Sequence, residues 1–284
     1  MFIKFYNDAG SITFDGKSTD ASPFKLIAAE GLTPASKTFT AAEFSGMPGQ
    51  ITTETRVRAR IITLSGDFPA GKGNVTLYSN LLRILDTEGW LCIYLNDIQR
   101  KIKCICSDFA EGERKGAYVP FVIQFTCDNP YFEDLEPVKR YLFKRIDNIN
   151  SSFKLPGIFT GRISKGDIMY TGSAKAEPII KIREFSSQVS QTAGGIEIYN
   201  NTHGEFIKLI YTPENDEEIT IDIANRKIYN NKGENLIMHI SNDTYLDEFA
   251  LYPGENEIEV INNDGENALI VTCEFANKYI EAVF

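Results

Sequence analysis

The chain has 284 residues, 43% of them hydrophobic and 24% charged, and no apolar stretch approaches the roughly 20 residues of a membrane-spanning helix. The formal net charge of −10 is uneven, because residues 178–284 hold 7 basic and 19 acidic side chains, against 22 and 20 in residues 1–177. An acidic second half disfavours a grip on nucleic-acid phosphates, which needs clustered cations, and supports a domain boundary near Pro178.

The first clear strand pattern is ITTETRVRARIITL, residues 51–64, where apolar and polar side chains alternate. We expect Val57, Ala59 and Ile61 to face one way and the arginines to face the other. Three exposed cations on one strand either form a solvated face or contact acidic groups of another subunit, for which arginine is well suited. The candidate interface residues are therefore Arg56, Arg58 and Arg60.

A glycine-rich loop follows, and its Gly66-x4-Gly71-Lys72 spacing is close to that of a phosphate-binding loop. Position 73 is glycine, so the hydroxyl that would hold Mg²⁺ is missing. We therefore interpret the loop as a turn with Asn74 as the N-cap of a helix. A nucleotide-binding enzyme built on Gly66–Gly73 is the alternative.

The next elements are a helix, a hairpin and a strand. Val75–Thr87 places Leu77, Leu81, Leu82 and Leu85 on one helical face. Residues 91–106 are predicted as an antiparallel hairpin that turns at Asn96-Asp97. Residues 118–127 are predicted as a strand, followed by a turn at residues 128–130. Antiparallel pairing after the helix disfavours the βαβ unit of a nucleotide-binding fold.

The remaining chain divides into an irregular part and a strand-rich part. Residues 141–177 show no clear period and are expected to be a connector or an arm between residues 1–140 and 178–284. From Pro178 onward, short alternating segments between Gly/Asn-rich turns predict a β-sandwich of jelly-roll type. These segments are PIIKIREF, GIEIYNN, EFIKLIY, EITIDIANRKIYNN, NLIMHIS, EFALYPGENEIEVINN, ALIVTCEF and KYIEAVF.

Few residues are suited to catalysis or to metal binding. The five cysteines occur in apolar, mostly strand-like segments, and Cys104-x-Cys106 lacks the spacing of a zinc pair, so we expect all five to be reduced and mostly buried. The two histidines, His203 and His239, lie in separate segments. We predict no catalytic residues, no metal site and no cofactor, in a mainly β protein with one helix.

In its order of elements the chain resembles the distal tail (Dit) family of long-tailed, siphovirus-type bacteriophages. The resemblance rests on RVRARIITLSGDF, LYSNLLRIL and FVIQFTCDNPYFED in the first half, and on AEPIIKI, ITIDIANRKIY and LYPGENEIEVI in the second. Residues 141–177 are the part that does not match the family.

The resemblance implies a structural virion protein with no enzyme activity, encoded by a phage or a prophage. Its N-terminal domains would form a hexameric ring, and its C-terminal domain would be a galectin-like sandwich. The ring would join the tail tube protein to the tail-associated lysin or fibre and to receptor-binding or baseplate proteins, with DNA only passing through the lumen. The expected location is the tail tip, after assembly in the bacterial cytoplasm.

An alternative function is carbohydrate binding, in which the C-terminal sandwich would recognise host-surface glycans through an aromatic platform. The candidate contacts are Tyr199, Tyr211, Tyr229, Tyr245 and Tyr252. Trp90, the single tryptophan, lies in the first half, which disfavours this alternative.

Overall fold

The structure, a computed structural model, divides the chain into two compact units. It describes residues 1–16, 22–46, 48–70, 75–147, 160–163, 165–184, 195–211, 213–214, 216–262 and 269–282. Unit 1 comprises residues 1–135 and 279–284, and unit 2 comprises residues 136–278. Among the described residues, no helix is long and apolar enough to cross a membrane.

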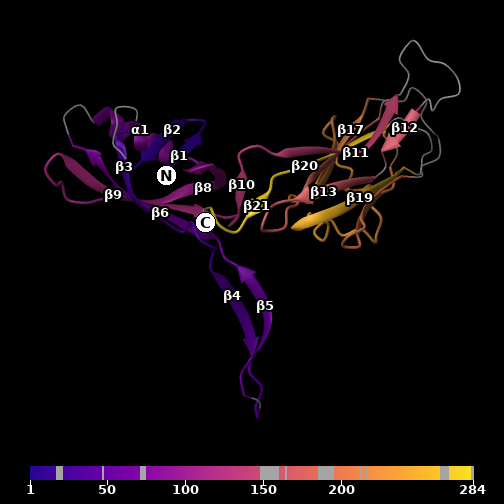
Figure 1. The fold of residues 1–284 in the computed structure, drawn as a ribbon, viewed down its shortest axis with the longest axis horizontal. Helices are drawn as coiled ribbons and strands as arrows, with labels where there is room; N and C mark the ends of the chain where they lie inside the picture. Colours follow the sequence, from indigo (N-terminus) through magenta and orange to yellow (C-terminus); the bar gives the residue numbers. More distant parts are fainter. Residues whose placement is uncertain are drawn as a thin grey trace. The chain divides into compact units, whose positions relative to one another are not determined.

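Unit 1 is built around a sheet that closes on itself (Figure 1). Seven strands of the described chain follow one another around the barrel in the order β8-β7-β1-β2-β3-β6-β9, and β9 pairs back with β8. Their bounds are β1 (Phe2–Asn7), β2 (Gly10–Asp15), β3 (Phe24–Glu30), β6 (Arg60–Pro69), β7 (Gly89–Leu95), β8 (Ile98–Glu111) and β9 (Tyr118–Cys127). Two short strands, β10 (Phe132–Asp134) and β21 (Lys278–Tyr279), extend the sheet beside β8.

Period-two alternation explains the barrel core. In β6, Arg60, Ile62, Leu64 and Phe68 are buried, whereas Ile61 is 57% exposed. The predicted hairpin and the strand 118–127 are confirmed as β7, β8 and β9. The turn between β7 and β8 has Asn96 at a φ of 53°, the left-handed conformation that asparagine tolerates.

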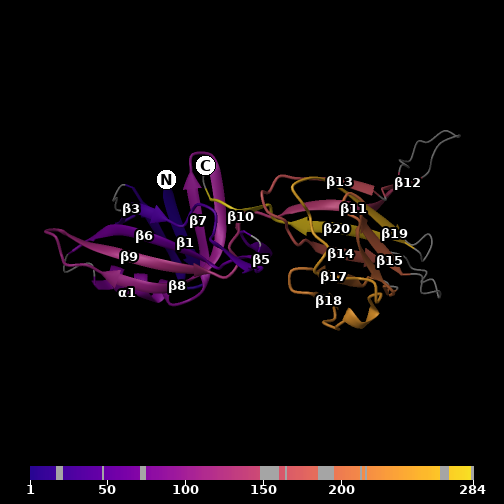
Figure 2. The same cartoon turned by 90° about the horizontal axis from the view of Figure 1, so that it is seen from below.

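The predicted helix is confirmed as α1 (Val75–Leu85). It lies along the outer side of the barrel (Figure 2) and contributes Leu81, Ile84 and Leu85 to the core. The prediction for Leu82 was wrong, because this side chain is 39% exposed and Ile84 takes the buried position instead. The predicted N-cap, Asn74, lies outside the described residues.

Unit 2 is a β-sandwich of a six-stranded and a four-stranded sheet, so the described chain has the predicted mainly β fold with one α-helix. The six-stranded sheet comprises, in spatial order, β12 (Thr160–Ile163), β11 (Val138–Asp147), β20 (Leu269–Phe275), β14 (Ile179–Glu184), β17 (Glu218–Asp222) and β18 (Lys227–Asn230). The four-stranded sheet comprises β13 (Lys165–Tyr170), β19 (Gly254–Asn262), β15 (Ile196–Asn200) and β16 (Glu205–Leu209). The two sheets share one core, in which isoleucine is the commonest residue.

Unit 2 differs from the sequence-based expectation in two places. Strands β11, β12 and β13 occupy part of residues 141–177, where we expected an irregular connector. β11 pairs with β20 through a bulge between Tyr141 and Phe143, and this bulge interrupts the alternation that would have revealed the strand. The segment NLIMHIS forms a 3-10 helix, Ile237–His239, and no strand.

Candidate subunit interface

The hairpin of β4 (Lys37–Ala42) and β5 (Ile51–Val57) is the part of unit 1 that packs least against the rest of the chain. It is a separate two-stranded sheet, and every residue of β5 is exposed. Figure 1 shows it projecting from the rest of unit 1. Isolated two-stranded hairpins are at best marginally stable in water, so this one needs a further surface to hold it.

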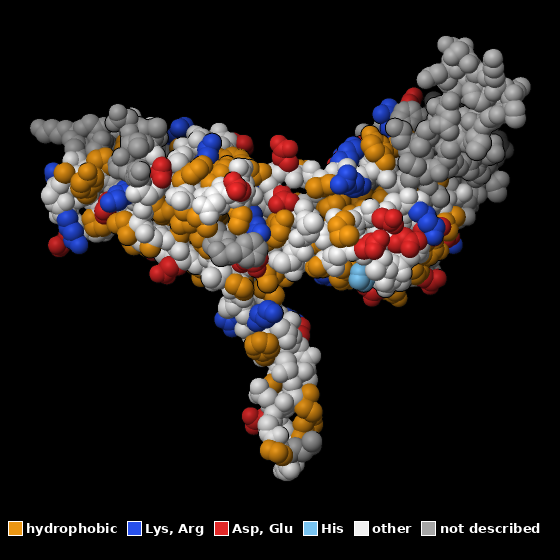
Figure 3. Space-filling model, in the orientation of Figure 1, with side chains coloured by type: hydrophobic (Ala, Val, Ile, Leu, Met, Phe, Trp, Pro, Cys, Tyr) orange, Lys and Arg blue, Asp and Glu red, His pale blue; other side chains and the backbone are white. Residues whose placement is uncertain are grey.

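The hairpin exposes apolar side chains. Phe39 is 58% exposed, and the pairing of Phe39 with Thr55 and of Lys37 with Val57 places Phe39 and Val57 on one face. Near the tip, Phe44 is 53% exposed and Ile51 is 54% exposed. Figure 3 shows hydrophobic side chains along the projection. Clustered apolar exposure of this kind marks an interaction surface in a soluble protein.

The three candidate arginines do not form one stripe, because strand structure stops after Val57 and resumes at Arg60 in another sheet. Arg56 is on the hairpin and pairs with Glu54 at 2.6 Å. Arg58, at the base of the hairpin, donates from Nε to Thr38 Oγ1 at 2.5 Å. The expectation that Arg60 is exposed was wrong, since it is buried in unit 1 with 3% exposure.

Arg60 instead holds distant segments of unit 1 together. Its guanidinium donates to the carbonyl oxygens of Pro130, Gly31 and Ile280 at 2.7 Å each, and also to that of Thr33. It lies over the Phe132 ring at 4.5 Å from the centroid. Burial lowers the pKa of Arg60 from its ordinary value, yet an arginine stays charged in proteins.

A second arginine binds the same carboxyl-terminal segment. Arg100 on β8 donates to the Glu281 carbonyl oxygen, lies 3.7 Å from a Glu281 carboxylate oxygen and stacks 3.7 Å from the Tyr279 ring centroid. The Ala282 amide donates to the Leu32 carbonyl oxygen at 2.8 Å. Residues 279–282 are thus a fixed part of unit 1.

The outer face of β1, β7 and β8 carries a group of aromatic and lysine side chains that the sequence analysis missed. The Phe2 and Tyr94 rings stack at 4.3 Å, and Lys101 Nζ lies 4.7 Å from the Trp90 ring centroid. The registers of β1 with β7 and of β7 with β8 place these side chains on adjacent positions of one face. The signal was available, because FIKFY and WLCIYL carry apolar or aromatic side chains on the strand face opposite the core as well as on the core face.

The phosphate-loop alternative finds no support in the geometry of Gly66. This residue lies inside β6, paired with Leu26 and Phe121, and a Cβ there would approach the Lys25 carbonyl oxygen to 2.1 Å. Gly66 therefore allows the strands to pack closely, and residues 71–74 lie outside the described part of the chain.

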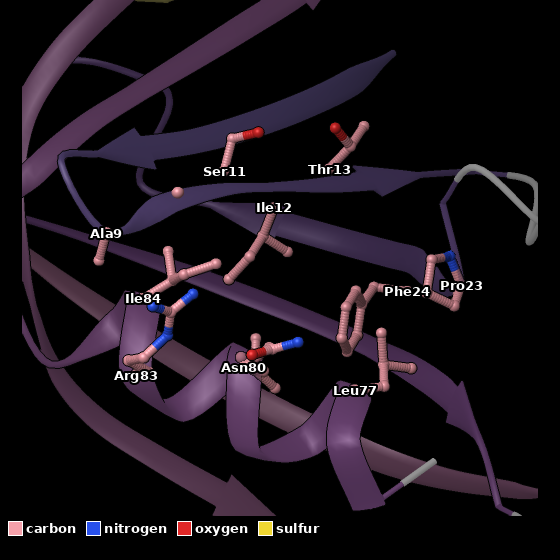
Figure 4. A pocket seen from close by; sticks show the side chains of 12 residues that line it. Ala9, Ser11, Ile12, Thr13, Pro23, Phe24, Leu77, Asn80, Arg83 and Ile84 are labelled. Atoms are coloured by element: carbon pink, nitrogen blue, oxygen red, sulfur yellow. The ribbon is translucent and has the colours of Figure 1, made fainter. Parts of the chain in front are cut away.

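A depression of about 430 Å³ lies between β2 and α1 and is lined by residues such as Ile12, Phe24 and Leu77 (Figure 4).

The five candidate glycan tyrosines do not share one surface. Tyr199 is on the outer face of the four-stranded sheet, where it stacks with Phe206 and donates to Glu197 at 2.6 Å. Tyr229 is on the outer face of the six-stranded sheet, on the opposite side of the sandwich. Tyr245 is 60% exposed.

The other two tyrosines have their hydroxyls bound to carboxylates. Tyr211 donates to both Glu217 carboxylate oxygens at 3.1 Å, and Tyr252 donates to Glu205 at 2.5 Å. Burial and then the Glu217 bond raise the pKa of Tyr211 to about 12, and chiefly the Glu205 bond raises the pKa of Tyr252 to about 12. These phenols stabilise unit 2 from within, and we do not propose a platform made of all five.

Comparison with known proteins identifies the class to which this fold belongs. Residues 171–279 match the family model of the siphovirus-type tail component, C-terminal domain. This part of the chain is therefore similar to a phage tail component domain. No curated protein matches the chain in sequence.

Solved structures extend the likeness to the whole chain. The SPP1 Dit protein (gp 19.1), from a phage that infects Gram-positive bacteria, matches with a TM-score of 0.65 at 16% identity, over 98% of this chain and 99% of that one. Two structures of the phage P2 baseplate in its activated conformation, with Ca and with Sr, match with TM-scores of 0.48 and 0.47 at 12% and 13% identity. These two matches cover 96% and 95% of this chain, and 97% of each of those chains. The match over residues 171–279 and the fold shared with the SPP1 Dit protein agree with the resemblance to the distal tail (Dit) family that the sequence predicted.

Proposed function

We propose that the chain is a structural hub of a phage tail tip, which assembles with copies of itself into a ring through unit 1. The observation that carries this proposal is the β4–β5 hairpin, whose apolar side chains lack cover from the described residues around them. The likeness to the SPP1 Dit protein supports it, because that protein is described as a paradigm of the hub of an adsorption apparatus.

The exposed apolar face of the β4–β5 hairpin can be covered by a neighbouring subunit. A projection on one part of a subunit that docks on a different part of the next subunit makes a head-to-tail contact, and such contacts close into rings when the rotation fits. Burying Phe39 and Val57 against a neighbour would stabilise the hairpin by about 1.5–3 kcal/mol for each large side chain that becomes fully buried. Arg56 and Arg58, at the same hairpin, are the proposed charged contacts.

The proposal extends to the neighbours that the family resemblance implies. They are the tail tube protein on one side, and the lysin or fibre and receptor-binding or baseplate proteins on the other. DNA would pass through the lumen without being held, since residues 1–177 hold 22 basic and 20 acidic side chains and so carry little net charge to attract phosphates. We propose no catalytic step.

The test is the oligomeric state of the full chain, measured by native mass spectrometry and negative-stain microscopy at tens of micromolar. We expect rings, with six copies of the 31.9-kDa chain as the predicted number. The double variant Phe39→Asp/Val57→Asp should lose the rings because charge replaces the apolar face of the hairpin.

The matched control is Met238→Asp, which alters a side chain of unit 2 that is 88% exposed and should leave the rings intact. A wild-type chain that stays monomeric at these concentrations would overturn the proposal. Rings that persist in the double variant would show that the subunit contact does not depend on the hairpin.

A further inference from the structure

The barrel of unit 1 closes at one seam, where β8 pairs with β9. The first part of β8 pairs with β7, and from Ile105 onward the strand pairs with β9. Ile105 lies opposite Thr126, so the next position along the antiparallel ladder places Cys104 opposite Cys127. Two thiols therefore meet where the sheet closes on itself.

The side chains of these two cysteines point the same way, into the barrel. Cys104 is 3% exposed and Cys127 is fully buried, and both belong to one apolar core. A hydrogen bond between the two thiols, together with burial, raises the pKa of Cys104. Opposite residues of an antiparallel pair have Cβ atoms about 4.5–5.5 Å apart. In a disulfide the two Cβ atoms are about 3.5–4.5 Å apart, so the two ranges meet at about 4.5 Å.

Cys106 is the competing partner, but it is less well placed. It lies two residues along the same strand from Cys104, and a strand rises about 3.3 Å per residue, so the two Cβ atoms are too far apart for a bond without distortion. The Cys106 sulfur contacts the Asp108 carbonyl oxygen at 3.5 Å, beside the bulge between Cys106 and Asp108.

Cys104 borders a depression of about 330 Å³ on the outer surface of the seam, together with residues that include Lys103, Thr126 and Asn129. Because the Cys104 side chain points into the core and is 3% exposed, a small oxidant such as a peroxide reaches its sulfur through local opening of the seam.

We propose that Cys104 and Cys127 are an oxidative modification site, at which hydrogen peroxide converts the two thiols into a disulfide that seals the barrel seam. In the first step the Cys104 sulfur attacks a peroxide oxygen, the O–O bond breaks, and Cys104 becomes a sulfenic acid with release of water. In the second step the Cys127 sulfur attacks the Cys104 sulfur, the S–O bond breaks and a second water leaves. Both thiol protons end in water, and the peroxide is the species reduced.

Two consequences follow from the environment of the pair. Because burial disfavours the thiolate, the reaction should be slow, on a scale of hours, and should not occur in a reducing cytoplasm. The bond would close a loop of residues 104–127 and should raise the melting temperature of unit 1 by about 5 °C. This inference concerns unit 1 alone and does not rest on the proposed function.

The experiment treats the full chain with hydrogen peroxide and then blocks free thiols with iodoacetamide under denaturing conditions. We expect two alkylation events fewer than in the untreated chain, and a Cys104–Cys127 linked peptide in the digest. Cys106→Ser is the matched control and should keep the link, while Cys104→Ala should abolish it. Since the link is mapped in the wild type, the test does not depend on the stability of any variant.

A chain that oxidises only at Cys106, or that forms a Cys104–Cys106 link, would overturn the proposal. So would a chain that retains all of its thiols after prolonged treatment. A mapped Cys104–Cys127 link whose formation leaves the melting temperature unchanged would overturn the sealing role.

Discussion

Replacing Arg60 should destabilise unit 1 more than any exposed substitution near it. Arg60→Met keeps much of the side-chain volume but removes every donor, so the carbonyl groups of Gly31, Thr33, Pro130 and Ile280 each lose a hydrogen bond. A hydrogen bond to a charged group contributes about 1.5–3 kcal/mol. Water that enters the relaxed site recovers part of this, and we expect a net loss of about 4 kcal/mol.

The assay is urea unfolding followed by the fluorescence of Trp90, which reports on unit 1 because it is the single tryptophan and lies on β7. With a slope of about 2 kcal/mol per molar urea, the midpoint should fall by about 2 M. Arg60→Lys should lie in between, because an ammonium group cannot reproduce the planar fork of donors.

The matched control is Arg58→Met. Arg58 makes its side-chain hydrogen bond with Thr38 in an exposed position, so its loss should change stability by less than about 0.5 kcal/mol. If Arg60→Met unfolds at the same urea concentration as Arg58→Met, the interpretation of Arg60 as the residue that joins these segments is wrong.

Two further predictions concern packing and pH. Gly66→Ala should destabilise unit 1 by about 2 kcal/mol in the same assay, since its Cβ would lie 2.7 Å from the Phe121 ring, whereas Gly16→Ala, with nothing within 4 Å, should be neutral. Because the pKa of Tyr211 and of Tyr252 is raised from 10 to about 12 in the folded chain, their stabilisation is complete below pH 10 and is lost as pH rises toward 12. Melting temperatures across this range should therefore fall more steeply for the wild type than for the Tyr211→Phe/Tyr252→Phe variant, and equal slopes would contradict the assignment.

The sequence was sufficient where the determining contacts are local. The hairpin of β7 and β8 follows from two alternating segments around a two-residue turn, and α1 follows from its 3.6-residue spacing. The strand β9 likewise follows from its alternation, because one face is apolar throughout and Phe121, Ile123 and Phe125 on that face are buried.

The sequence was insufficient where the residues that determine a contact are distant from one another in the chain. Arg60 looks like a surface cation, and its burial depends on carbonyl groups that lie up to 220 residues away. The alternation of residues 51–64 also runs on through the point where β5 ends and β6 begins, so no local signal marks the change of sheet. Only the three-dimensional pairing separates the exposed Arg56 from the buried Arg60.

The return of residues 279–282 into unit 1 gives unit 2 two backbone attachments, one before β11 and one after β20. A pull on unit 2 would therefore be shared between two covalent tethers. The later tether ends in a short segment that Arg60 and Arg100 bind through its carbonyl oxygens. A chain built in this way can transmit tension from one unit to the other without depending on a single linker.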